Sequence, residues 1–119
     1  MQDNVEIYTK ALIQVIYDSR EYREFVKAKK KVAGQPELKA QINQYRMDVY
    51  KLQNYCDAKD LFEQTEEFNR QHAQFRKNPL VDEYLRSELA VCRILQRVAS
   101  EVVDSVDLDL DDIAGKIRL

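Results

Sequence analysis

The side chains best suited to chemistry in this sequence are one histidine, His72, and two cysteines, Cys56 and Cys92. An imidazole can serve as a general base or a metal ligand, and a thiolate can serve as a nucleophile or a metal ligand. Glu63 and Glu67 lie near the histidine in sequence, but nothing supplies further ligands at matched spacing. We therefore expect no metal and no cofactor, a half-buried, hydrogen-bonded His72, and two free thiols packed as small apolar side chains.

Three alternating aspartates, Asp107, Asp109 and Asp111, match the first ligand positions of a calcium-binding EF-hand loop. In that loop the sixth position is a glycine and the twelfth is a bidentate glutamate. Here those positions hold Asp112 and Arg118. The pattern therefore indicates an acidic, solvated tail rather than a calcium site.

The remaining acidic residues do not form a catalytic arrangement. Pairs such as Glu21 and Glu24 lie on one helix face, whereas acid–base catalysis needs carboxyl groups in a cleft with separated pKa values. The 119 residues include only two glycines, too few for a glycine-rich phosphate loop or a nucleophile elbow. We predict that the protein is not an enzyme.

The one local excess of charge is basic. It comprises Arg20, Arg23, Lys27, Lys29, Lys30 and Lys31. Such a face could contact an RNA backbone or an acidic protein surface. Glu21 and Glu24 offset it, no aromatic residue lies between the lysines, and the net charge of the whole chain is -2. Two interpretations stay open: a solvated helix face, and an RNA-binding face.

Length and composition predict one small, all-α domain. Two glycines and two prolines leave few tight turns, which favours long helices over a sandwich or barrel. No apolar run approaches the roughly 18 residues needed to cross a bilayer, so we expect no membrane association. Asp3 and Glu6 occupy the region where a signal peptide would be basic, and we expect a cytoplasmic protein.

The apolar periodicity predicts about five helices. They cover residues 3–18, 20–32, 36–56, 61–77 and 79–106, followed by the acidic tail 107–119 in the same domain. Ser19 and Asn78 are expected to cap the second and fifth helices, and Pro36 and Pro79 to occupy first turns. Gly34 is expected to adopt a positive φ after the second helix.

The third and fourth predicted helices carry apolar residues at alternating steps of four and three. Because a short polar break joins them and neither can bury its stripe alone, we expect an antiparallel helical hairpin. Asp60 stands at capping-box spacing from Glu63 and is expected to start the second arm. The predicted hairpin seam consists of Leu38, Ile42, Tyr45, Val49, Leu52, Leu61, Phe68, His72 and Phe75.

The last predicted helix is apolar on two adjacent faces. One stripe is Val81, Leu85, Cys92, Leu95, Ala99, Val102 and Val106, and the other is Leu80, Tyr84, Val91, Ile94 and Val98. The hairpin can cover one face, and the first two helices or another subunit must cover the other. The first helix offers its own apolar face through Val5, Tyr8, Leu12 and Val15. We expect a homo-oligomer, a dimer or larger, with Tyr84, Val91, Ile94 and Val98 as its candidate interface.

A characteristic set of residues is spread over most of the chain. It comprises Ser19, Glu21, Tyr22, Phe25, Ala28, Pro36, Glu37, Ile42 and Tyr45, followed by the run from Asn78 to Leu85. Over about residues 3–105 this pattern resembles the YlbF/YmcA family of small helical bacterial proteins. The resemblance implies an all-α fold with a projecting hairpin, and association with itself or with related proteins.

The same resemblance carries expectations about function. The best-known members are regulatory adaptors that join related family proteins in a complex linked to an endoribonuclease and RNA maturation, with effects on competence, biofilm formation and sporulation. Some members have a C-terminal cysteine-rich tail associated with an iron–sulfur cluster. This sequence has no cysteine after Cys92, so we do not carry that cluster over.

Overall fold

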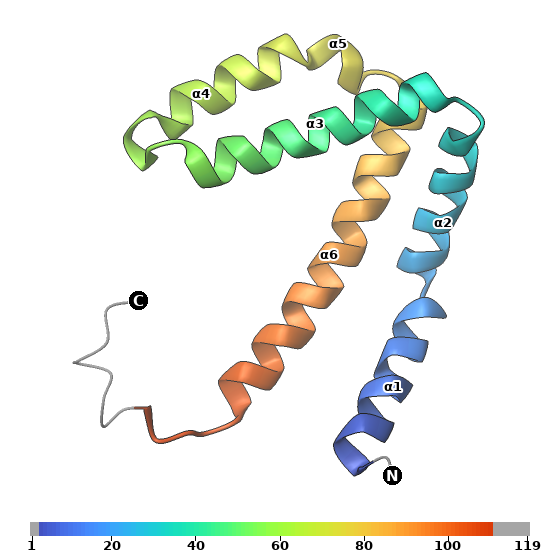
Figure 1. Ribbon diagram of the computed structural model, residues 1–119, viewed down its shortest axis with the longest axis vertical. Coiled ribbons are helices and arrows are strands. Elements are labelled where there is room, and N and C mark those ends of the chain that lie inside the picture. The colour runs from blue at the N-terminus through green and yellow to red at the C-terminus, as the bar shows by residue number, and fades with distance from the viewer. Residues whose placement is uncertain (1–2, 111–119) are drawn as a thin grey trace.

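The computed structural model describes residues 3–110, which form six α-helices and no strand (Figure 1). The helices are α1 (Asn4–Tyr17), α2 (Arg20–Ala33), α3 (Pro36–Tyr55), α4 (Ala58–Gln71), α5 (Ala73–Arg76) and α6 (Pro79–Ser105). The all-α prediction is confirmed, as is the long C-terminal helix. The first, second, third and fifth predicted helices end within one residue of the observed boundaries.

The predicted caps explain why two of these helices begin where they do. The Ser19 hydroxyl accepts a hydrogen bond from the Tyr22 amide at 3.2 Å, and the Asn78 side chain accepts one from the Leu80 amide at 2.9 Å. Each side chain thus accepts from a backbone N–H group of the first turn that has no acceptor within the helix. Pro79 follows Asn78 at the first helical position, where its missing N–H costs nothing.

Two predictions about helix ends are wrong. Gly34 has φ −75°, in the right-handed region, and the chain leaves α2 through a tight turn in which the Gln35 amide donates to the Val32 carbonyl at 2.9 Å. Helix α4 begins at Ala58, one turn earlier than expected, so Asp60 lies within the first turn and does not cap it.

The helix predicted over residues 61–77 is divided at His72. There φ is −104° and ψ is 7°, which ends α4, and α5 begins at the next residue. The Phe68 carbonyl accepts from the His72 amide at 3.1 Å and also lies 2.8 Å from Nδ1 of the His72 ring. A side chain that competes for a backbone carbonyl in this way distorts a helix. The periodicity of the apolar residues continues across the break and therefore concealed it.

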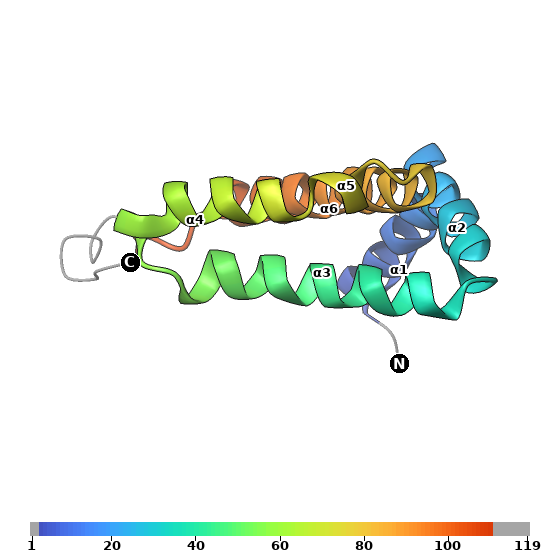
Figure 2. The ribbon, with the colours of Figure 1, turned by 90° about the horizontal axis from the view of Figure 1, so that it is seen from above.

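The helices form a flat, open arrangement with extents of 50 × 41 × 21 Å. In Figure 1, α2 runs antiparallel beside the first half of α6, and α1 continues away from α2 at the lower end. The hairpin of α3 and α4 projects sideways from the upper end. Figure 2 shows its two arms running antiparallel, as predicted.

The buried core lies where α2, α3 and α6 meet, and we call this region the joint. It consists of Ala28, Val32, Leu38, Ile42, Val81, Tyr84 and Leu85. Leu38 and Ile42 were predicted to belong to the hairpin seam, but the structure places them in the joint because the first turns of α3 cross α2 and α6 before the hairpin separates from them. The core therefore occupies one corner of the molecule.

Tyr84 of α6 contacts both other helices of the joint. Its ring packs edge-on against Phe25 of α2 with 5.4 Å between centroids. Its hydroxyl accepts hydrogen bonds from Nζ of Lys39 at 2.7 Å and from Nη1 of Arg46 at 3.3 Å, both on α3. Nη2 of Arg46 also forms an ion pair with Glu88 of α6 at 2.7 Å.

We predict that Tyr84→Phe lowers the free energy of unfolding by about 1–2 kcal/mol, because two cationic donors at the joint lose a shared acceptor. Urea unfolding followed by circular dichroism measures the change. Tyr50→Phe is the matched control, since Tyr50 is 55% exposed and lies outside the joint. Equal stability of the two variants would contradict this role of the Tyr84 hydroxyl.

Candidate functional site

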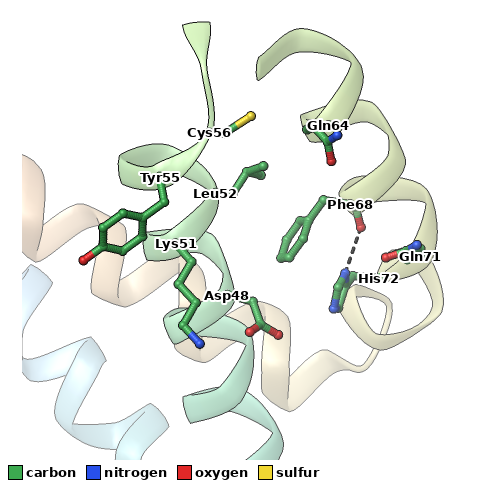
Figure 3. Close-up of a pocket in the computed structure, with 9 residues that line it drawn as sticks. All are labelled: Asp48, Lys51, Leu52, Tyr55, Cys56, Gln64, Phe68, Gln71 and His72. Atoms are coloured by element: carbon green, nitrogen blue, oxygen red, sulfur yellow. Dashed lines mark hydrogen bonds between the residues drawn. The ribbon is translucent and has the colours of Figure 1, made fainter. Parts of the chain in front are cut away.

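The hairpin encloses an open groove between α3 and α4 (Figure 3). It is lined by Asp48, Lys51, Leu52, Tyr55, Cys56, Gln64, Phe68, Gln71 and His72. Leu52 and Phe68 point into the space between the two arms, and charged and amide groups surround them. The groove is thus a shallow, mixed surface rather than an enclosed pocket.

An aromatic cluster holds the two arms of the hairpin together beside this groove. Tyr45 of α3 packs against Phe68, His72 and Phe75, with centroid distances of 5.3, 5.3 and 5.5 Å. Phe68 and His72 are themselves 4.1 Å apart. These four predicted seam residues meet, and each is half-buried, as are Val49, Leu52 and Leu61. Toward the tip, Tyr55 and Phe62 lie off the seam and are largely exposed.

His72, the one imidazole of the groove, makes backbone and aromatic contacts. The His72 ring contacts the Phe68 carbonyl and two aromatic rings, as expected of a half-buried histidine. No group of three or more His, Cys, Asp or Glu side chains within residues 3–110 could hold a metal ion. Both cysteines are free thiols; Cys56 is half-buried, whereas Cys92 is exposed, contrary to the prediction that it is packed.

A larger feature is the apolar surface of α1. None of its residues, Asn4–Tyr17, is buried. Val5, Tyr8, Leu12 and Val15 form one stripe and are 77, 74, 39 and 65% exposed. We call these four residues the α1 face. The sequence predicted that either the first two helices or another subunit would cover the last helix. In the structure the stripe on α1 remains open to solvent.

A second open stripe lies on the C-terminal half of α6. Leu95 and Val102 are more than half exposed, as is Val106, the C-cap residue just after the helix, and Val98 is half-buried. We call these four residues the α6 distal face. It is uncovered because α2 packs only against the first half of α6, near the joint. Helix α1, which precedes α2, lies apart from the second half of α6 (Figure 1).

The candidate interface predicted from the sequence needs correction. Tyr84 is 1% exposed and Val91 is 9% exposed, so contacts within the chain already cover both. Ile94 and Val98 are half-buried. Tyr84 belongs to the joint, and the burial of Val91 shows that cover by the chain extends farther along α6.

The basic face of α2 is partly neutralised. Lys31 forms an ion pair with Glu83 of α6 at 2.9 Å. Nε of Arg20 lies 3.8 Å from Glu21 and 4.0 Å from Glu24. Among the other basic residues, Arg23, Lys27 and Lys30 are exposed, and Lys29 lies near the Phe25 ring at 5.7 Å. Carboxylates thus lie beside two of these basic residues, Arg20 and Lys31.

Comparison with known proteins identifies the family. The family model for control of the competence regulator ComK, YlbF/YmcA, matches residues 7–107, which include all six helices apart from the first turn of α1. The chain belongs to the YlbF/YmcA family. The resemblance noted in the sequence is thereby confirmed, and the family is one of competence control. No curated protein and no solved structure matches the chain.

Within residues 3–110, no helix combines the length and the apolarity needed to cross a membrane.

We predict that Phe68→Ala opens the hairpin without unfolding the joint, because Phe68 contacts Tyr45 and His72 but no residue of the core. Hydrogen exchange should accelerate in α4 and remain unchanged in α2 and the first half of α6. The matched control is Phe62→Ala, since Phe62 is 72% exposed and should leave both regions unaffected. Acceleration spread evenly over all helices would contradict a locally opening hairpin.

Proposed function

We propose that this YlbF/YmcA protein is a non-enzymatic regulatory adaptor that acts through helix-mediated association with itself and with related family proteins. The observation that carries the proposal is the α1 face, four large apolar side chains that no other part of the described chain buries. Contiguous apolar surface of this kind on a small protein typically marks an interaction site.

Family membership supports a more specific role. We propose that the complex joined by this adaptor is linked to an endoribonuclease and RNA maturation, and through them to competence, biofilm formation and sporulation. The site of action on this proposal is the bacterial cytoplasm. The protein contributes binding surfaces, while the chemistry on RNA belongs to the nuclease.

The alternative, an RNA-binding module on α2, has weaker support in the geometry. Lys31 and Arg20 have carboxylate neighbours, which reduces the positive potential that an RNA backbone would meet. The helices of the hairpin carry no comparable basic cluster. We therefore favour protein docking over RNA docking.

The proposal predicts that Leu12→Glu reduces partner capture at least about tenfold, because it places a charge in the centre of an apolar contact. Tagged wild-type and variant proteins would be expressed in the native bacterial host and purified under mild conditions. Quantitative mass spectrometry then measures related family proteins and the endoribonuclease in each eluate. Gln14→Glu is the matched control, since it adds the same charge to the opposite face of α1.

Two results would count against the adaptor. Equal recovery of partners by Leu12→Glu and wild type would show that the α1 face is not used. Recovery of RNA alone, lost as salt is raised, would instead favour the module on α2.

A further inference from the structure

We propose that the C-terminal segment, residues 111–119, folds back along α6 of its own chain and docks in an open notch between α3 and α6. The occupant of this surface is thus supplied by the chain itself. The inference goes beyond the proposed function, because it concerns a contact within one copy and involves neither the α1 face nor a partner protein.

The notch has a volume of about 740 Å³ and is open to solvent. Its apolar lining consists of Met47, Val49 and Tyr50 from α3 and Cys92 from α6. Met47 and Tyr50 are 52 and 55% exposed, and Cys92 is exposed as well. Arg46 and Glu88, which form an ion pair, also line the notch. It therefore offers an apolar surface that the described part of the chain leaves open.

An exposed strip of α6 leads from the end of the helix to this notch. Cys92, Ala99 and Val103 follow one another at intervals of seven and four residues, which places them on one ridge of the helix. Val103 is 72% exposed, and Ala99 is exposed too. The small side chain of Ala99 lets an extended backbone approach closely. We call these three residues the α6 track.

The described residues that follow α6 turn the chain toward the hairpin. Asp109 has φ 55°, a left-handed conformation that aspartate adopts more readily than most residues. Its amide donates to the Asp107 carboxylate at 2.8 Å, so the Asp107 side chain holds the turn. Figures 1 and 2 show residues 106–110 leaving the end of α6 on the side to which the hairpin projects. The chain is thus directed into the space between α6 and the hairpin.

The sequence of the C-terminal segment suits an extended chain lying on an apolar surface. Alternate residues of an extended chain face opposite sides. From residue 113 onward one set is Ile113, Gly115, Ile117 and Leu119, and the other is Ala114, Lys116 and Arg118. The first set supplies three large apolar side chains for the α6 track and the notch, and the second set leaves both charged side chains in solvent.

The lengths of the two paths agree. Cys92 precedes Ser105, the last residue of α6, by 13 residues, or about 20 Å of helix. Seven residues of extended chain, 111–117, span about 23 Å. If the segment starts level with Ser105 and runs back along α6, Ile117 therefore arrives beside Cys92. By the same count, Ile113 lies beside Ala99.

Disulfide trapping in the full chain tests this register, because a disulfide forms only where two thiols come within a few ångströms. Cys56→Ser removes the other thiol, and a serine can keep the hydrogen bond to the Asp57 carbonyl. Ile117→Cys is then compared with Lys116→Cys, its neighbour on the opposite side of the segment. After mild copper–phenanthroline oxidation of dilute protein, we expect at least about fivefold more intrachain disulfide to Cys92 from Ile117→Cys.

Mass spectrometry of the intact, unreduced protein separates disulfides within one chain from those between chains, and peptide mapping identifies the linked residues. Selective intrachain linkage of Ile117→Cys supports the docked segment. Equal yields from the two positions would show a segment that reaches Cys92 without docking, and would overturn the proposal. Linkage between chains only, or no linkage to Cys92 from either position, would overturn it as well.

A second measurement needs no added thiol. In the Cys56→Ser chain, Ile117→Asp should release the segment and speed the alkylation of Cys92 by iodoacetamide at least about threefold, because thiol reactivity follows access. Ala114→Asp adds the same charge on the opposite side of the segment and should leave the rate unchanged. Circular dichroism checks that both variants keep their helices. An unchanged rate in Ile117→Asp, or equal acceleration in both variants, would contradict docking beside Cys92.

Discussion

The burial of Tyr84 at the corner between α2, α3 and α6 is the contact on which the rest of the structure depends. Its ring fills the apolar joint, and its hydroxyl reaches the edge of α3, where Lys39 and Arg46 donate to it. A tyrosine can be buried at low cost only where its hydroxyl finds partners. This requirement fixes the point at which α3 leaves the α2–α6 pair, and hence the direction of the hairpin.

Because the core occupies that one corner, three elements extend from it with little support. The hairpin is held by half-buried aromatic rings, α1 by its connection to α2, and the second half of α6 only by the partial burial of Ile94 and Val98. The free energy of folding scales with the apolar surface removed from water, so docking would add to the stability of these elements. The open shape of this YlbF/YmcA protein and its proposed adaptor role thus have a common cause.

Much of this architecture could be predicted from the sequence because its signals are local. Ser19 and Asn78 cap helices through atoms two or three residues away, and the apolar steps identify the helices themselves. The break at His72 could not be predicted, because the same steps continue across it. The exposure of the α1 face and the burial of Tyr84 depend on where the chain turns, and periodicity shows which residues share a face but not what covers it.

The central claim is that the α1 face and the α6 distal face are covered by docking. Hydrogen–deuterium exchange of the unmodified protein at low and high concentration tests it most directly. The account predicts that amides of α1 and of the second half of α6 exchange more slowly as concentration rises, while the tip of the hairpin does not change. Exchange in α1 and distal α6 that is independent of concentration, in a protein that also captures no partner, would contradict it.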